Sequence, residues 1–392
     1  MIVEGHCMDK ERIHFSRNDT KAIKGIAIVL MLMHHLWTFS ERIPLEYTIL
    51  TPVFSFTLNG KEVFTAFGEF GKICVSMFMF LGGYALYKQC TVEKIGFSLE
   101  QKIIKIYSSY WRVFFIYIPM GFLFFSQQVQ CTEAPYHNKY TEFNLNKFIL
   151  NFIGVSSSYN DEWWFLFPYI IVTILGYICI ELIKEKKKKS FYTESLLVVC
   201  LTIFIVKILP TIGILEIFKN LKSDILFKNI FLWHPATCAF FMGIIMARHN
   251  WFEEKINAIS NRYSKIVQCV ISTVGMLIVF YLRTFNYGIY LDIFFAPLFS
   301  LFCLMILKNC KVLYIMFVFL GKHSTNIWLI HSFYCYYFTS ITKVIYCSRN
   351  AIIDLGVLLS FSLVSSIMIE QFYMILGRIT DRIWIVKCKN NE

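Results

Sequence analysis

Two histidines lie inside strongly apolar segments, where an ionisable side chain is uncommon and marks a candidate site. His35 lies roughly 17 Å along a helix from Lys24, and His331 reaches nearly the same depth in a second segment of the same direction. Imidazole can accept a hydroxyl proton or carry an acyl group, so we expect one shared site. The alternative is that each histidine makes a structural interhelical hydrogen bond. His34 points about 100° away from His35, so we expect only one of them to face the site directly.

A pair of carboxylates opens another apolar segment. Asp161 and Glu162 directly precede Trp163 and Trp164. A carboxylate beside an imidazole can orient it, and aromatic rings can stack on a sugar. The alternative is a solvated helix start followed by an aromatic belt at the membrane surface.

Basic residues precede a further apolar segment. Lys102 and Lys105 share one helix face, and Arg112 follows them. A phosphate-bearing ligand would bind such a group, although the usual excess of basic residues on the cytoplasmic side explains it equally. The thirteen cysteines are scattered without a Cys-x-x-Cys pair, and we expect no metal site.

The composition indicates that these residues belong to a membrane protein. Of 392 residues, 57% are hydrophobic and only 16% are charged. Such a composition excludes a soluble enzyme or a disordered chain and favours an all-α, polytopic helical bundle. The net charge of +12 does not form a basic stripe with interleaved aromatic residues, so we expect no nucleic-acid partner.

The apolar runs predict about ten transmembrane helices. They are 23–39, 70–87, 113–130, 163–183, 195–215, 229–247, 266–282, 289–307, 324–341 and 351–376. The run 312–320 is too short to cross a membrane, and we interpret it as an interfacial or re-entrant piece that leads into the ninth span.

The distribution of basic residues predicts the orientation. With both termini in the cytoplasm, the inside segments hold 26 of the 38 lysines and arginines. The tract 184–189 is the clearest anchor, and contact with lipid headgroups is its alternative role. We expect a cytoplasmic segment 1–22, a transmembrane domain 23–376 and a cytoplasmic tail 377–392, in a multi-pass protein of the cell membrane.

In order and spacing, these motifs resemble the integral-membrane acyltransferases of family 3. The family has ten spans and a first-span motif of Arg, ten residues and His, to which Lys24 and His35 correspond with Lys in place of Arg. Its paired basic motif resembles Lys102 and Lys105, again with Lys for Arg. Two more of its motifs resemble segments of this chain: Asp161-Glu162-Trp163-Trp164-Phe165-Leu166-x-Pro168, and Gly321-Lys322-x-Ser324 with His331.

The resemblance implies an activity and its partners. It implies an O-acyltransferase that takes an acyl group, most commonly acetyl, from acyl-coenzyme A on the cytoplasmic side. The acceptor would be a hydroxyl of a surface glycan or a lipid-linked saccharide. Because the chain ends soon after its tenth span, we expect either that the membrane unit performs the whole reaction or that a partner protein completes it. A homodimer is left open.

The resemblance also implies roles for the residues above. Lys102, Lys105 and Arg112, with Lys24, would hold the nucleotide end of coenzyme A. His35 would act as general base or transient acyl carrier, oriented by Glu162 or Asp161. His331 would stabilise charge or hold the acceptor, for which Trp163, Trp164, Ser324 and His34 are further candidates. A glycan flippase or polymerase without acyl transfer is the chief alternative, but the predicted external face carries few basic residues to hold a lipid pyrophosphate.

Overall fold

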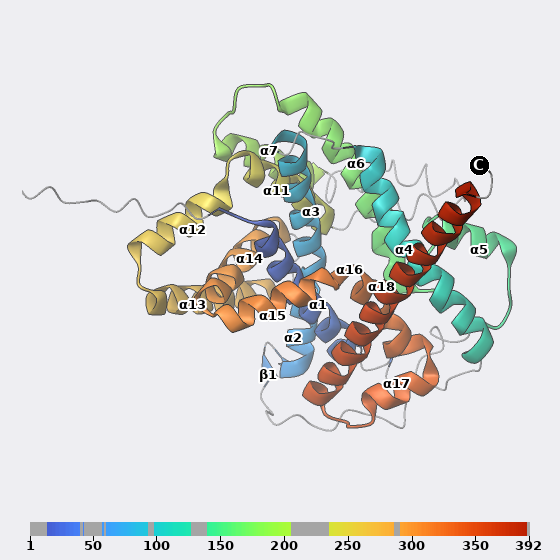
Figure 1. Ribbon diagram of the computed structural model, residues 1–392. Coiled ribbons are helices and arrows are strands. Elements are labelled where there is room, and N and C mark those ends of the chain that lie inside the picture. Colours follow the sequence, from blue (N-terminus) through green and yellow to red (C-terminus); the bar gives the residue numbers. More distant parts are fainter. Residues whose placement is uncertain are drawn as a thin grey trace, which may run out of the picture.

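The protein is almost entirely helical, as its apolar runs predict (Figure 1). The computed structural model describes residues 14–39, 42, 57–58, 60–92, 98–126, 139–204, 235–285 and 291–389. Within these residues, the strands β1 (Thr57–Leu58) and β2 (Lys61–Glu62) form one short antiparallel hairpin. The predicted all-α class is confirmed.

The described residues contain α-helices, two short 3₁₀ segments and one π-helical turn. In chain order they are α1 (Arg17–Trp37), α2 (Val63–Gly71), α3 (Ile73–Thr91), α4 (Leu99–Phe124), α5 (Leu145–Phe152), the 3₁₀ helix η4 (Asp161–Phe165), α6 (Leu166–Ile183), α7 (Phe191–Ile203), the 3₁₀ turn η6 (Pro235–Thr237), α11 (Cys238–Arg248), α12 (Trp251–Arg262), α13 (Lys265–Arg283), α14 (Asp292–Asn309), α15 (Lys311–Lys322), α16 (Ser324–Ser332), the π-helical turn η8 (Phe333–Tyr337), α17 (Thr339–Tyr346) and α18 (Ala351–Lys389).

Within the described residues, five helical stretches are long and apolar enough to cross a membrane. They are Val63–Thr91, Asp161–Ile183, Lys265–Arg283, Asp292–Asn309 and Ala351–Ile379, and they correspond to five of the ten predicted spans. α1 and α4 overlap the first and third predicted spans but are not among the five. The shorter apolar helices α7 and α11 overlap the fifth and sixth predicted spans, much of whose length lies outside the described residues.

A bent helix pair forms the predicted ninth span and the short run before it. α15 and α16, which η8 extends, meet at an angle of 63°. At the bend, His323 adopts a backbone conformation outside the α-helical range, and its side chain contacts Ser366 of α18 at 3.0 Å. The short apolar run is therefore observed as a separate helix leading into the span. Counted as one span, the pair raises the total to six.

Glycines allow two helix pairs to approach closely. A methyl group on Gly83 of α3 would lie 1.9 Å from the carbonyl oxygen of Phe240, and one on Gly243 of α11 would lie 2.1 Å from that of Phe80. Gly321 makes the same kind of contact with the backbone of Lys21, at 1.8 Å. Small residues at helix crossings are typical of membrane bundles, in which close backbone packing stabilises the association of helices. These contacts fix α3 against α11 and α1 against α15.

A buried ion pair joins α13 and α14 to the junction between α2 and α3. Arg283 donates to both carboxylate oxygens of Asp292, at 2.7 and 3.1 Å, and to the carbonyl oxygens of Glu69 and Phe70. Ser76 donates to the same carboxylate at 3.0 Å. The charge of Asp292 is thus neutralised within the helix bundle, as a buried carboxylate requires.

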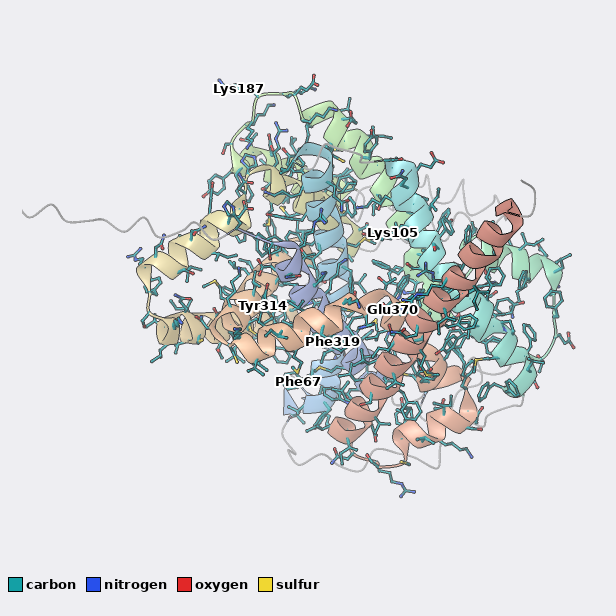
Figure 2. All side chains as sticks on the ribbon, viewed as in Figure 1. Phe67, Lys105, Lys187, Tyr314, Phe319 and Glu370 are labelled. Atoms are coloured by element: carbon teal, nitrogen blue, oxygen red, sulfur yellow. The ribbon has the colours of Figure 1, made fainter. Side chains whose placement is uncertain are left out.

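The loop between α6 and α7 lies apart from α2. Figure 2 shows Lys187, in this loop, at the top edge of the view and Phe67 of α2 in its lower half. The basic tract and the segment predicted to be external therefore lie apart. The orientation with both termini in the cytoplasm stays a prediction from the charge distribution.

Candidate active site

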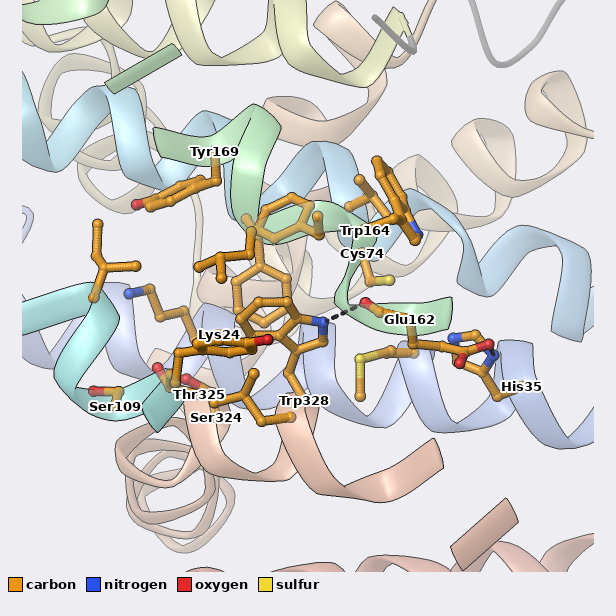
Figure 3. A pocket seen from close by; sticks show the side chains of 18 of the residues that line it. Lys24, His35, Cys74, Ser109, Glu162, Trp164, Tyr169, Ser324, Thr325 and Trp328 are labelled. Atoms are coloured by element: carbon orange, nitrogen blue, oxygen red, sulfur yellow. Dashed lines mark hydrogen bonds and ion pairs between the residues drawn. The ribbon is translucent and has the colours of Figure 1, made fainter. Parts of the chain in front are cut away.

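An elongated cavity of about 850 Å³ is lined by residues of α1, α3, α4, η4, α6 and α16. We call the part lined by Lys24, Lys102 and Lys105 the lysine end. We call the part lined by His35, Arg42 and Glu162 the histidine end. Figure 3 shows Lys24 and Ser109 on one side of this cavity and His35 and Glu162 on the other. Most of the predicted site residues line this single space.

Glu162 is held beside His35 by the short helix η4. Asn160 caps this helix by accepting a hydrogen bond from the backbone N–H of Glu162 at 3.1 Å, and it also accepts one from Ser332 at 2.9 Å. The indole of Trp328 donates to the carbonyl oxygen of Glu162 at 3.2 Å. These bonds tie η4 to α16 and place Glu162 Oε1 3.8 Å from His35 Nδ1.

Two further residues hold the Glu162 carboxylate. Arg42 lies 3.3 Å from Oε1, and the hydroxyl of Tyr337 donates to Oε2 at 3.1 Å. The Glu162 side chain is only 7% exposed, so a charged carboxylate there needs such partners. We expect the arrangement to fix the carboxylate rigidly against the imidazole.

The proton on His35 can be assigned from its neighbours. Tyr336 donates its single hydroxyl hydrogen to the backbone carbonyl of His35 at 2.6 Å. Its oxygen also lies 3.3 Å from His35 Nδ1, where it therefore acts as an acceptor. The Glu162 carboxylate lies 3.8 Å away on the same side, where its charge favours a proton on Nδ1. We assign the proton of neutral His35 to Nδ1, which leaves the Nε2 lone pair available as a base.

His331 lies against His35. The two ring centroids are 4.8 Å apart, so the structure brings both predicted histidines together. His331 Nδ1 lies 2.7 Å from the carbonyl oxygen of Trp328, which requires a proton on Nδ1. Its Nε2 is buried and accepts no hydrogen bond from the described residues. His331 itself is not among the residues that line the cavity.

His34 also lines the cavity, so the expectation that only one of the two neighbours would face it is wrong. The Nδ1 of His34 lies 2.9 Å from the carbonyl oxygen of Gly68 and 3.1 Å from the Thr38 hydroxyl. His34 thus ties α1 to α2, whereas His35 contacts the carboxylate.

The two acids have different surroundings. Asp161 is 49% exposed and pairs with Lys139 at 2.6 Å, while Tyr337 lies 3.4 Å from its other oxygen. Both Asp161 and Glu162 line the cavity, but the structure pairs only Glu162 with His35.

The two predicted tryptophans, Trp163 and Trp164, also differ in their surroundings. Trp164 lines the cavity, whereas Trp163 is 1% exposed, packs on Tyr110 and donates to the Leu329 carbonyl at 2.9 Å. Trp163 is therefore a core residue in this structure. Ser324, at the start of α16, lines the cavity together with Thr325.

The lysine end combines three ammonium groups from two helices. Lys24 comes from α1, and Lys102 and Lys105 come from the first turns of α4. Lys102 bonds Gln89 of α3 at 2.8 Å. Ser98, Gln101 and Ser109 supply further polar groups, and no described acidic residue lines this end. Arg112 lies in an adjoining pocket of about 390 Å³ that shares Lys105 with the cavity.

Three of the residues at the histidine end are absent from the sequence-based prediction. Arg42 follows α1, and its pairing with Glu162 joins segments far apart in the chain, for which the sequence gives no local signal. Tyr336 and Tyr337 belong to the π-helical turn η8, and their only signal is an aromatic run after His331. Turns of this type occur frequently at functional sites. Within the described residues, no group of histidine, cysteine or acidic side chains could hold a metal ion.

The fold and the site together define a membrane-embedded helical protein with a histidine–carboxylate pair and a cationic cluster in one cavity. A comparison with protein families agrees with this class: the family model Acyl_transf_3, described as an acyltransferase domain, matches residues 19–370. The chain therefore belongs to the acyltransferase 3 family and is a multi-pass membrane acyltransferase. No curated protein and no solved structure matches the chain.

Proposed function

We propose that the protein transfers an acyl group, most commonly acetyl, from acyl-coenzyme A to a hydroxyl of a cell-surface glycan or of its lipid-linked precursor. The observation that carries this proposal is the cavity itself. It connects three ammonium groups, at an end that no described acidic residue lines, with a histidine–carboxylate pair at the other end. A thioester donor with phosphates at one end and a reactive carbonyl at the other matches this arrangement.

The lysine end suits the nucleotide part of the donor. The positive charges here repel one another, because the ammonium groups of Lys24, Lys102 and Lys105 interact electrostatically. An anion that binds between them relieves this repulsion. Lysine binds phosphate as a point charge. Arg112 would extend this surface through the adjoining pocket. The pantetheine arm would then run along the cavity, and the thioester would lie near His35. No metal ion or other cofactor has a role in this proposal.

The histidine end suits the chemistry. In our proposal, His35 Nε2 takes the proton of the acceptor hydroxyl while the hydroxyl oxygen attacks the thioester carbonyl carbon. The tetrahedral intermediate collapses, the carbon–sulfur bond breaks, and the thiolate of coenzyme A receives the proton from His35. Tyr336 accepts the hydrogen bond from Nδ1, and the nearby Glu162 carboxylate stabilises the transient imidazolium through its charge. Transient acylation of His35 is a variant of the same step.

The acceptor and the location of the protein belong to the same proposal. Flat apolar surfaces on which a sugar ring can stack line the cavity wall, contributed by Phe39, Trp164, Phe165 and Trp328.

Exposed apolar side chains follow α13 and α18, as expected for helices that contact lipid. We place the protein in the plasma membrane with both termini in the cytoplasm. The lysine end would then open to the cytoplasmic donor. A second copy of the chain or a partner protein would bind to this membrane unit.

The test uses labelled acetyl-coenzyme A and purified protein in liposomes. Release of free coenzyme A and transfer of label to crude surface glycan are measured for wild type and His35→Ala, with His14→Ala as a control for an exposed histidine. We expect activity in wild type and in the control, and loss of at least about 100-fold in His35→Ala. If wild type neither binds nor turns over acetyl-coenzyme A, the proposal is wrong, and a flippase or polymerase becomes the better interpretation.

A further inference from the structure

Lys72 is an ionisable residue within an apolar span. It lies between α2 and α3, inside the stretch Val63–Thr91 that is apolar enough to cross a membrane. Its side chain lines the cavity, as do Cys74 and Val75 of the following helix turn. It is also near enough to His34 and His35 to influence both electrostatically. A lysine in such a position is a functional candidate by default.

The charge of Lys72 is not neutralised by the described residues around it. Asp292, the described acid that acts on it electrostatically, has both of its oxygens bonded to Arg283 and one also to Ser76. The other acids of this region have their own cations: Glu69 pairs with Lys61, Asp161 with Lys139, and Glu162 with Arg42. Lys72 itself forms no ion pair or hydrogen bond with another described side chain. Counted over the described residues, the surroundings of His34 and His35 therefore carry a surplus positive charge.

The proposed reaction forms a negative charge at this same end. When the hydroxyl oxygen adds to the thioester carbonyl, the carbonyl oxygen becomes an oxyanion that needs a donor. The other described polar groups nearby are already engaged: Tyr337 donates to Glu162, the charge of Arg42 is paired with Glu162, and His34 Nδ1 lies against the Gly68 carbonyl. Lys72 has an ammonium group available.

Resting on the function proposed above, we propose that Lys72 is a catalytic residue that stabilises the oxyanion of the tetrahedral intermediate. The ammonium group donates a hydrogen bond to the former carbonyl oxygen while His35 holds the hydroxyl proton. On collapse the electron pair returns to the carbon–oxygen bond, the carbon–sulfur bond breaks, and Lys72 keeps all its protons. A cation placed where charge develops, in surroundings of low polarity, is the usual form of such stabilisation.

The test compares Lys72→Met, which keeps most of the length of the side chain, with Lys72→Arg, which keeps its charge. Lys61→Met is the matched control, because Lys61 pairs with Glu69 of α2 and does not line the cavity. Acetyl-coenzyme A turnover is measured with water as acceptor and with crude surface glycan. Coenzyme A binding and thermal unfolding are measured on the same preparations.

We expect Lys72→Met to lower kcat about 100-fold or more with both acceptors, with unchanged coenzyme A binding and an unchanged KM for glycan. Lys72→Arg should retain more activity than Lys72→Met, and Lys61→Met should match wild type.

Three results would overturn the assignment. Wild-type kcat in Lys72→Met would exclude a role in the intermediate. A rise confined to the KM for glycan would assign Lys72 to an anionic group of the acceptor. Failure of both Lys72 variants to fold would make the residue structural. Each of these leaves wild-type turnover intact, whereas absent turnover in wild type would remove the proposed function and the role of Lys72 with it.

Discussion

The imidazole rings of His35 and His331 lie 4.8 Å apart, although they come from the first helix and from the π-extended helix near the other end of the chain. His331 stands outside the cavity lining, and its Nδ1 proton is fixed by the Trp328 carbonyl. His331 thus packs against His35 without lining the cavity, so we expect it to position the base without contacting substrate.

Replacement of His331 should therefore affect turnover more than binding. His331→Phe keeps a ring against His35 but removes both nitrogens. We expect kcat to fall about 10-fold, because the hydrogen bond that fixes His331 to the Trp328 carbonyl is lost, while the KM for acetyl-coenzyme A stays the same. Steady-state kinetics of coenzyme A release measures both constants. An increased KM with normal kcat would instead place His331 in a binding role.

The two acids should differ in their effect on catalysis. Glu162→Gln keeps the shape of the side chain but removes the charge that faces His35 Nδ1, so we expect kcat to fall by roughly 10²-fold to 10³-fold. Asp161→Asn should cost less than about 10-fold, because Asp161 is half exposed and pairs with Lys139. Single-turnover release of labelled coenzyme A distinguishes the two variants. Equal losses would contradict the pairing of Glu162 with His35.

The cationic cluster should control the affinity for the donor. We expect Lys102→Met and Lys105→Met each to raise the KM for acetyl-coenzyme A about 10-fold, since a hydrogen bond to a charged group contributes roughly 1.5–3 kcal/mol. The effect should weaken as salt is added. Lys88→Met is the control, because Lys88 bonds Asn250 and Glu253 and does not line the cavity. An unchanged KM in both cluster variants would show that the nucleotide binds elsewhere.

The sequence predicts those parts of the fold that depend on apolar runs. The helical class and the short run before the ninth span follow directly from hydropathy. α1 illustrates the limit: Lys24, His34 and His35 interrupt its apolar character, and it is not among the five apolar stretches found in the described part of the chain. Lys24, His34 and His35 belong to the site, and the same three residues lower the hydropathy from which the sequence predicts α1.

The sequence predicts those site residues whose spacing places them on one face of a single helix. Lys102 and Lys105 lie on one helix face, and both line the cavity. Contacts between distant segments were not predictable. Nothing near Arg42 in the sequence indicates Glu162, and the prediction treated Trp163 and Trp164 alike, although only packing decides which one faces the cavity.

We accordingly expect the two tryptophan substitutions to differ: one should lower stability and the other should impair activity. Trp163 is buried and bonded to the Leu329 carbonyl, so we expect Trp163→Ala to lower the free energy of unfolding by about 3–5 kcal/mol. Trp164→Ala should leave stability nearly unchanged and raise the KM for glycan about 3-fold to 10-fold through lost stacking. Thermal unfolding in detergent and kinetics with crude glycan measure the two effects. A stable Trp163→Ala variant with impaired glycan binding would reverse the assignment.

Close packing between α3 and α11 can be tested at one glycine with a second glycine as control. A methyl group on Gly243 would lie 2.1 Å from the Phe80 carbonyl oxygen, so the two helices must separate to accept it. We expect Gly243→Ala to destabilise the protein by about 1–3 kcal/mol, the usual range for overpacking. In Gly356→Ala the new methyl group meets nothing within 4 Å, and the better helix propensity of alanine should stabilise α18 by up to about 1 kcal/mol. Thermal unfolding in the same detergent compares them directly. If both variants unfold at the wild-type temperature, the glycine contact does not hold the helices together.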